Sequence, residues 1–252
     1  LVNGIKSLEL ETLNNLKNSK SPNTLRAYES DYKDFSAFCI KNNFSPLPAD
    51  PKILSLYLTK LSQTSKFSTL KRRIASISII HKLKGHYIDT KHPIIMENLL
   101  GIKRQKGSNQ KAKKPLLISD LKTIIDVINE VKISEKRQLR DKALILIGFC
   151  GGFRRSELVA LEYEDIEFVR EGVKIFVKRS KTDQSGEGMT KAIPSFANAL
   201  YCPVVHLQNW IYELEIKKGK IFSISDKSVA LIIKKYATLA GLDGNNYAGH
   251  SL

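Results

Sequence analysis

The stretch GFCGGFRRSELVAL, residues 148–161, marks the point at which the chain changes from a helical pattern to a strand pattern. The preceding LRDKALILIGFC is almost entirely apolar, which is typical of a central buried helix. Gly151 and Gly152 end this helix, and two consecutive arginines, Arg154 and Arg155, follow the break. Beyond them the hydrophobic period changes to two in IEFV, VKIFVKRSK and MTKAIP, which predicts a small antiparallel sheet.

The chain that precedes this junction is predicted to be helical. In SPNTLRAYESDYKDFSAFC we expect Ser21 to cap a helix, and in ADPKILSLYLTKLSQ we expect the same of Asp50. FSTLKRRIASISIIHKLKG and HPIIMENLLGIKR continue the helical spacing of apolar residues, as do PVVHLQNWIYEL and SDKSVALIIKKYATLAGL after the sheet. The expected fold class is therefore mainly α with a small antiparallel β-sheet.

Composition shifts between the two halves of the chain. Residues 103–114, KRQKGSNQKAKK, hold six basic residues and no acidic one. Such a segment buries too little apolar surface to offset its ordering entropy, which predicts a linker. We therefore expect a helical domain at residues 1–102, a basic linker at residues 103–114 and a second domain at residues 115–252. In the second domain, Ser119 is expected to cap the helix in LLISDLKTIIDVINEV.

The overall charge indicates a polyanionic partner. The formal net charge is +16 and the isoelectric point is about 9.7. Solubility does not require so large an excess, so nucleic acid is the favoured partner and an anionic membrane is the alternative. No run approaches the roughly 18 apolar residues of a membrane-spanning helix. We therefore expect a nucleic acid, and no membrane, as the partner.

The cysteines and the N-terminus point to a reducing compartment. Cys39, Cys150 and Cys202 lie far apart, and neither they nor the histidines have the spacing of a zinc site. We expect free thiols and no metal. The initial LVNGIKSLELETLNN has no signal-peptide layout, which predicts a cytoplasmic, nucleoid-associated protein.

Three residues are candidates for chemistry, and each has a simpler interpretation. Arg154 at a helix start is a candidate anion-binding group, but spacing alone favours an ion pair with a nearby glutamate. The candidate partners of the two arginines are Glu157, Glu162 and Glu164. Lys181 lies between two predicted strands, where a lysine is usually only solvated. His250 in YAGHSL could donate to an oxyanion or transfer a proton, but a single histidine is more often structural.

Taken together, these residues resemble the tyrosine recombinase (phage integrase) family. GGFRRSEL is similar to that family's first arginine box, which makes Arg154 its catalytic arginine and Glu157 the acidic residue that braces the box. RSKT resembles the catalytic lysine segment, with Lys181 in that role, and GHSL resembles the start of the His-x-x-Arg box, with His250 as its histidine. The N-terminal helices resemble the SAM-like core-binding domain of relatives of Cre. The second domain would then be the α+β catalytic domain.

The resemblance implies a site-specific recombinase that cleaves and rejoins DNA through a 3′-phosphotyrosyl intermediate. Arg154 would stabilise charge on the phosphate, Lys181 would act as general acid, and His250 would add a hydrogen bond. No cofactor is implied, since the covalent intermediate conserves the energy of the broken bond. The second arginine and the nucleophilic tyrosine are expected beyond Leu252. We therefore expect a C-terminally incomplete chain that is inactive and monomeric alone and forms tetramers on paired DNA sites when complete.

The resemblance also directs attention to the basic residues of the helical domain and the linker. The residues predicted to contact DNA are Arg26, Lys33, Lys71, Arg72, Arg73, Lys103, Arg104 and Lys106. Most would contact phosphates, which position the protein without reading sequence. Three alternatives remain, namely a catalytically inactive DNA-binding remnant or regulator, a type IB topoisomerase, and a basic helical scaffold.

Overall fold

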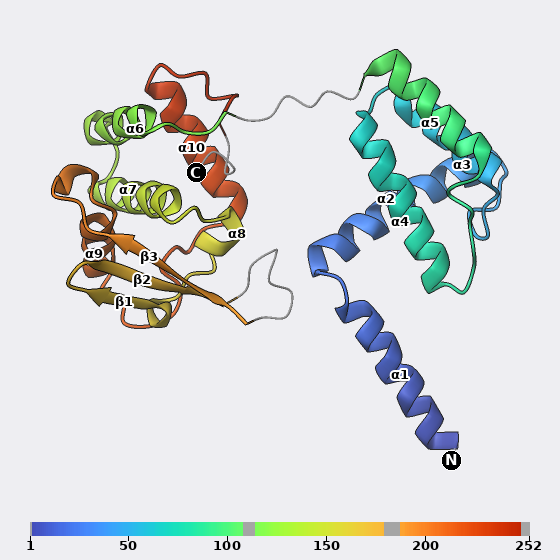
Figure 1. Cartoon of the computed structure of the whole chain (residues 1–252), viewed down its shortest axis with the longest axis horizontal. Coiled ribbons are helices and arrows are strands. Elements are labelled where there is room, and N and C mark those ends of the chain that lie inside the picture. Colours follow the sequence, from blue (N-terminus) through green and yellow to red (C-terminus); the bar gives the residue numbers. More distant parts are fainter. Residues whose placement is uncertain (1, 108–113, 179–186, 248–252) are drawn as a thin grey trace. The chain divides into compact units, whose positions relative to one another are not determined.

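The structure, a computed structural model, describes residues 2–107, 114–178 and 187–247 (Figure 1). The chain divides into two compact units, unit 1 at Leu1–Gln110 and unit 2 at Lys111–Leu252. The described part of unit 1 is helical, and that of unit 2 combines helices with a small antiparallel sheet. The fold class predicted from the sequence is confirmed.

Unit 1 is built from helices that pack in pairs. Helix α2 contacts α4, and α3 contacts α5. A shared apolar core lies between them and includes Phe35, Leu54, Leu58, Leu70 and Ile77. The bounds are α1 (Val2–Asn18), α2 (Pro22–Lys41), α3 (Pro51–Ser62), α4 (Phe67–Leu83) and α5 (Pro93–Lys106).

Two of the predicted helix caps in unit 1 are confirmed. Ser21 Oγ accepts the backbone N–H of Thr24 at 3.3 Å, and Asp50 Oδ1 accepts that of Lys52 at 2.6 Å. Each side chain thereby satisfies an N–H group that the first turn of a helix leaves without a partner. Local sequence therefore sets where α2 and α3 begin.

Helix α5 extends into the segment predicted as a linker. It ends at Lys106, so residues 103–106 are helical, and Gly107 with φ of +71° closes the helix. Tertiary contacts support this extra turn: Ile102 is buried, and Lys106 Nζ donates to the carbonyl of Ser62 at the end of α3. Residues 108–113 of the predicted linker lie outside the described residues.

Unit 2 places helices around a short meander of strands. Helix α7 packs against α9, and α10 contacts both α6 and α8. The expected cap at Ser119 is wrong: Leu117, in extended conformation, precedes the helix, so α6 begins two residues earlier than a cap at Ser119 would give and Ser119 lies within its first turn. The bounds are α6 (Ile118–Glu130), α7 (Glu135–Cys150), α8 (Arg155–Leu158), η1 (Tyr163–Asp165), β1 (Ile166–Val169), β2 (Gly172–Val177), β3 (Met189–Pro194), η2 (Ala199–Tyr201), α9 (Pro203–Glu213) and α10 (Asp226–Leu239).

The sheet has the strand order β1-β2-β3, and both pairs are antiparallel (Figure 1). Along β2, Val173, Ile175 and Val177 are buried while the residues between them are exposed. Ile193 on β3 pairs with Val173 and is also buried. The period of two in the sequence therefore corresponds to one buried and one solvated face.

A buried polar contact ties α7 to α10. Asp141 is 4% exposed and accepts the Tyr236 hydroxyl at 2.8 Å. Arg140 Nη2 lies 2.7 Å from the same carboxylate. The charge buried at Asp141 is thus both paired and hydrogen-bonded, as burial of a carboxylate requires. Of the helices in the described ranges, none has the length and apolar character needed to cross a membrane.

His81 is fully buried in unit 1, and its contacts define its protonation state. Its Nε2 accepts the backbone N–H of Ala49 at 3.1 Å, so Nδ1 carries the proton and donates to the Ile77 carbonyl at 2.8 Å. Burial lowers the pKa of His81 below its ordinary value of 6.5. A second proton on Nε2 would face the Ala49 N–H, donor against donor.

We predict that unit 1 loses stability in mild acid because of His81. Its folded-state pKa is below the unfolded value, so the stabilisation is complete above the unfolded pKa of about 6.5 and declines below it, by at most about 1.4 kcal/mol per pH unit. Urea unfolding followed by circular dichroism from about pH 8 to about pH 5 measures this decline.

The matched variants are His81→Gln and His86→Gln, the second at an exposed histidine of the same unit. The His81 variant is expected to be less stable at neutral pH and less sensitive to acid. The His86 variant should differ only slightly from the parent, because the His86 charge lowers the pKa of His81 less than burial does. Equal acid sensitivity in all three proteins would contradict the prediction.

Candidate functional site

Glycine is required at both positions between α7 and α8, for a different structural reason at each. A Cβ on Gly151 would lie 2.3 Å from Cε2 of Phe153, so a side chain there would displace the buried Phe153 ring. Gly152 has φ of +56°, a backbone conformation that favours glycine. The chain can therefore turn sharply after α7 and bring Arg154 to the start of α8.

Arg154 is held by a buried carboxylate. Its backbone N–H donates to Glu157 Oε2 at 2.9 Å, and its Nη1 donates to Glu157 Oε1 at 2.8 Å. The Glu157 side chain is 3% exposed, whereas that of Arg154 is 40% exposed. One carboxylate thus fixes both ends of the arginine while its guanidinium still reaches solvent.

The other acidic candidates pair elsewhere. Glu162 binds Lys178, which also lies 2.9 Å from Asp165, and Glu164 accepts the backbone N–H of Gly219 at 2.9 Å. The hydrogen bonds to Glu162 and Asp165 raise the pKa of Lys178. Hydrogen bonds from its own backbone N–H and from that of Gly219 lower the pKa of Glu164. Of the three predicted glutamate partners, Glu157 alone pairs with Arg154 in the described part of the chain. The ion pair that spacing favours and the bracing of Arg154 by Glu157 that the resemblance implies are therefore the same contact.

Lys191 on β3 completes this cluster and was not among the candidates. Its Nζ donates to the carbonyls of Gly151 at 2.7 Å and Gly152 at 2.9 Å. It lies 3.9 Å from Glu157 Oε2 and 4.4 Å from the centroid of the Phe153 ring, with 16% of its side chain exposed. Burial lowers the pKa of Lys191, Glu157 opposes that shift, and the Arg154 charge adds to it.

A signal for Lys191 was present in the strand pattern. The buried Ile193 lies two residues further along β3, so Lys191 shares its inward face. In the sheet register Lys191 also pairs with the buried Ile175. A lysine on an inward face needs acceptors, and the glycine carbonyls together with Glu157 supply them.

The other two predicted catalytic residues, Lys181 and His250, lie outside the described residues. Lys181 falls between the end of β2 at Val177 and the start of β3 at Met189. The chain that leads to His250 is anchored in unit 2, since the hydroxyl of Tyr247 donates to Asp120 on α6 at 3.0 Å. The structure therefore brings together Arg154 and Glu157 of the predicted set.

The basic residues predicted to contact DNA lie on three helices of unit 1. Arg26 and Lys33 lie on α2, two turns apart, and both are exposed. Lys71 on α4 is exposed, with its Nζ 5.3 Å from the Phe67 ring centroid. On α5, Lys103, Arg104 and Lys106 are exposed, although Lys106 also binds the end of α3.

Arg72 and Arg73 are engaged by Asp31, a buried carboxylate on α2. Arg72 Nη1 and Ser76 Oγ both donate to Asp31 Oδ2. Arg73 Nε lies 3.3 Å from Asp31 Oδ1, and its Nη1 donates to the Asp31 carbonyl at 3.0 Å. The Arg73 side chain is 16% exposed and that of Arg72 is 46% exposed. This contact joins α2 to α4, so Arg73 in particular is committed to helix packing.

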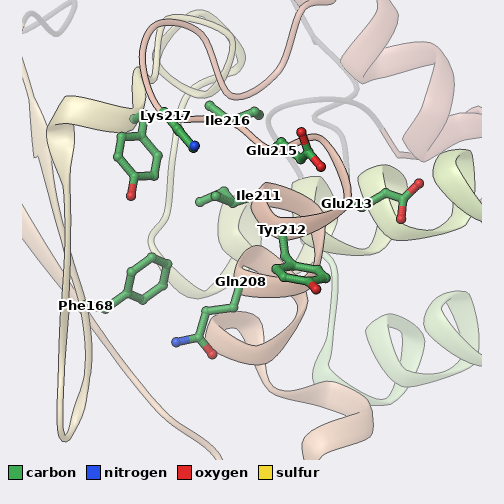
Figure 2. Close-up of a pocket in the computed structure, with 9 residues that line it drawn as sticks. Phe168, Gln208, Ile211, Tyr212, Glu213, Glu215, Ile216 and Lys217 are labelled. Atoms are coloured by element: carbon green, nitrogen blue, oxygen red, sulfur yellow. The ribbon is translucent and has the colours of Figure 1, made fainter.

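A separate hollow of about 800 Å³ lies on unit 2 (Figure 2). Figure 2 shows Phe168 of β1 on one side and Gln208 and Tyr212 of α9 on the other. It shares no lining residue with the cluster around Arg154. Within the described ranges, no group of three or more His, Cys, Asp or Glu side chains is placed to hold a metal ion.

We predict that Glu157→Gln destabilises unit 2 by about 1 to 3 kcal/mol, because an amide cannot accept both Arg154 bonds and directs its own N–H₂ group at a cation. The single tryptophan, Trp210, lies in the core of unit 2, so its fluorescence during urea unfolding reports on this unit.

The matched control is Glu167→Gln on strand β1 of the same unit. That carboxylate is 66% exposed and lies 3.4 Å from Lys174 Nζ, so its loss should change stability by less than about 1 kcal/mol. Equal effects of the two substitutions would contradict the structural importance of the Glu157 contacts.

Comparison with family models gives no match. Comparison with curated proteins finds an integrase/recombinase xerD homolog of Selenomonas ruminantium, 41% identical over 260 residues, covering 97% of this chain and 75% of the relative. A tyrosine recombinase of Agathobacter rectalis is 27% identical over 199 residues, covering 75% of this chain and 62% of the relative.

Two solved structures share the fold. One is the XerH site-specific recombinase bound to palindromic difH substrate, with a TM-score of 0.61, 17% identity, and coverage of 81% of this chain and 59% of the XerH chain. The other is a lambda integrase dimer bound to a COC′ core site, with a TM-score of 0.56, 16% identity, and coverage of 96% and 82%. The extent of the Selenomonas match and the shared fold establish that this chain belongs to the tyrosine recombinase family.

Proposed function

We propose that the complete protein is a site-specific recombinase that breaks and rejoins DNA strands, with Arg154 as an electrophilic group at the scissile phosphate. The observation that carries the proposal is the pose of Arg154, whose guanidinium is anchored by the buried Glu157 yet 40% exposed. Among the described residues, a single Nη1 bond to Glu157 occupies this guanidinium, so its other donors are available to phosphate oxygens.

Phosphodiester cleavage needs charge stabilisation above all. Negative charge develops on the non-bridging oxygens as the nucleophile attacks, and fixed donors aimed at that position lower the barrier. Glu157 holds the Arg154 guanidinium in position before the phosphate arrives, so the arginine needs no rearrangement during the reaction. A lysine at the position of Arg154 would lack the planar fork that binds two oxygens.

The remaining roles are proposed from the matched motifs. A tyrosine of the complete protein attacks phosphorus and loses its hydroxyl proton to solvent water, a bond forms between the tyrosine oxygen and phosphorus, and the bond from phosphorus to the 5′ oxygen breaks. Lys181 protonates that oxygen, and His250 together with a second arginine binds the phosphate. Rejoining is the reverse, with the 5′ hydroxyl attacking the phosphotyrosyl bond.

We predict that Arg154→Ala in the complete protein lowers single-turnover cleavage by at least about 100-fold. Its loss of affinity for duplex DNA should be small, because the other basic residues supply most of the phosphate contacts. A suicide substrate that traps the covalent adduct measures cleavage, and a binding titration measures affinity.

The matched control is Arg155→Ala, one residue further along, at the variable position of the box. It should retain cleavage near the parent rate. Unchanged cleavage by Arg154→Ala would remove Arg154 from the mechanism. Absence of any covalent adduct with the unaltered complete protein would favour an inactive DNA-binding protein.

Unit 1 is proposed to hold the DNA through exposed cations. Five of these cations are exposed and can reach phosphates, namely Arg26, Lys33, Lys71, Lys103 and Arg104. Arg72 is bound to Asp31 through Nη1, but its side chain is 46% exposed, so its other donors can reach phosphates. Arg73 and Lys106, which already bind Asp31 and Ser62, would contribute less directly.

We predict that DNA affinity falls steeply with salt, with a log–log slope steeper than about −3, because each neutralised phosphate releases counterions. Lys71→Ala should make the slope shallower by about 1. Lys52→Ala, at an exposed lysine outside the predicted set, should leave it unchanged. A flat titration would contradict the proposed DNA-binding surface.

Assembly belongs to the same proposal. A lambda integrase tetramer bound to a Holliday junction shares the fold with a TM-score of 0.55 and 16% identity. We propose that the complete protein likewise acts as a tetramer on paired sites at the nucleoid, and that residues 1–252 alone are monomeric. The 41% identity to an integrase/recombinase favours recombination over a type IB topoisomerase, and a plasmid relaxation assay separates the two.

A further inference from the structure

Lys191 contacts the arginine box through two hydrogen bonds and one ion pair. Two of its hydrogen bonds go to consecutive carbonyls, those of Gly151 and Gly152, and its charge lies 3.9 Å from Glu157. These acceptors lie at the break between α7 and α8, whereas Lys191 itself lies on β3. The side chain therefore links the sheet to the turn that carries Arg154.

The glycine turn needs such a link. Gly152 has a left-handed φ of +56°, and no Cβ restrains either glycine. The carbonyls that Lys191 binds are those of the two glycines that precede Phe153 and Arg154 in the chain. Holding both carbonyls fixes the orientation of the two peptide planes, and hence the direction in which the chain enters α8.

Lys191 also changes the electrostatics of the cluster. Arg154, Lys191 and Glu157 comprise two cations and one buried anion, which leaves a net positive charge. Without Lys191, Glu157 would neutralise Arg154 within the cluster. With it, the guanidinium retains a positive field toward an incoming phosphate.

We propose that Lys191 is a positioning residue for Arg154, which ties β3 to the α7–α8 turn and so fixes where the guanidinium meets the scissile phosphate. This inference rests on the proposed recombinase function. It gives Lys191 no contact with the DNA, and so distinguishes it from Lys181, the proposed general acid.

The first experiment compares Lys191→Met with Lys191→Arg in the complete protein. The methionine keeps the apolar stem and removes charge and donors, whereas the arginine keeps both. Lys191→Met is expected to slow single-turnover cleavage by about 10-fold to 100-fold, since a misplacement of about 1 Å at a reacting centre costs that much. Its affinity for duplex DNA should stay within about threefold of the parent, and Lys191→Arg should recover most of the rate.

The matched control is Lys174→Met, on the neighbouring strand β2. That lysine is 47% exposed, and its residue pairs with Ala192, next to Lys191 in the register. It should cleave at the parent rate. Trp210 fluorescence establishes that each variant is folded. If Lys191→Met does not fold, the cleavage rate of Lys191→Arg is measured in its place. A Lys191→Arg cleavage rate as low as that of Arg154→Ala would overturn the proposal.

A second experiment asks whether Lys191 acts through Arg154. A methylphosphonate at the scissile position lacks one anionic non-bridging oxygen, so cleavage there depends less on the arginine. The Lys191→Met defect should shrink on this substrate in parallel with that of Arg154→Ala. On the ordinary substrate, the double variant should be no slower than Arg154→Ala alone.

The outcomes separate the inference from the function on which it rests. Parent-like cleavage by Lys191→Met, together with loss of cleavage in Arg154→Ala, would overturn the positioning role and leave the recombinase intact. An equal Lys191→Met defect on both substrates would also overturn it. Failure of the unaltered complete protein to form any adduct would remove the proposed function itself, and the inference with it.

Discussion

The buried carboxylate of Glu157 is the contact on which the candidate site depends. It is the shared acceptor for the backbone and the guanidinium of Arg154, and it lies close to the charge of Lys191. A carboxylate at 3% exposure is stable only when it is paired and hydrogen-bonded. The hydrogen bonds that satisfy the Glu157 carboxylate also hold Arg154 in one orientation.

Much of the fold could be predicted from the sequence, because helix caps and the alternation of residues along strands depend mainly on residues near each other in the chain. The caps at Ser21 and Asp50 and the strands IEFV and MTKAIP depend on neighbouring residues alone, and each lies where the sequence indicates. The last turn of α5 differs from expectation because tertiary contacts support it, and α6 begins before Ser119 rather than after it. At the site, the bonds between Arg154 and Glu157 could be anticipated from a spacing of three residues. The contact with Lys191 could not, since it joins segments 40 residues apart.

Contacts between distant segments also decide which basic residues of unit 1 are free to bind DNA. Arg73 is predicted from the sequence to contact DNA, yet it lies on the inward side of its helix and meets Asp31 between α2 and α4. A helical pattern shows that Arg73 falls three residues after the buried Leu70 and four before the buried Ile77, which places it toward the core. Which carboxylate it meets there depends on how two helices pack.

Both units therefore use one device to organise an excess of positive charge. Among the described residues the buried acidic side chains are Asp31, Asp141, Glu157 and Asp165, and each has an arginine or lysine as a partner. Cations held in this way lose their freedom to follow a phosphate backbone, whereas unpaired ones such as Lys33 keep it. A recombinase needs both kinds, because general affinity for DNA tolerates mobile charges while catalysis at one phosphate does not. Burial of a few carboxylates thus fixes some of the many cations in place, Arg154 at the candidate site among them, and leaves the others free to attract DNA.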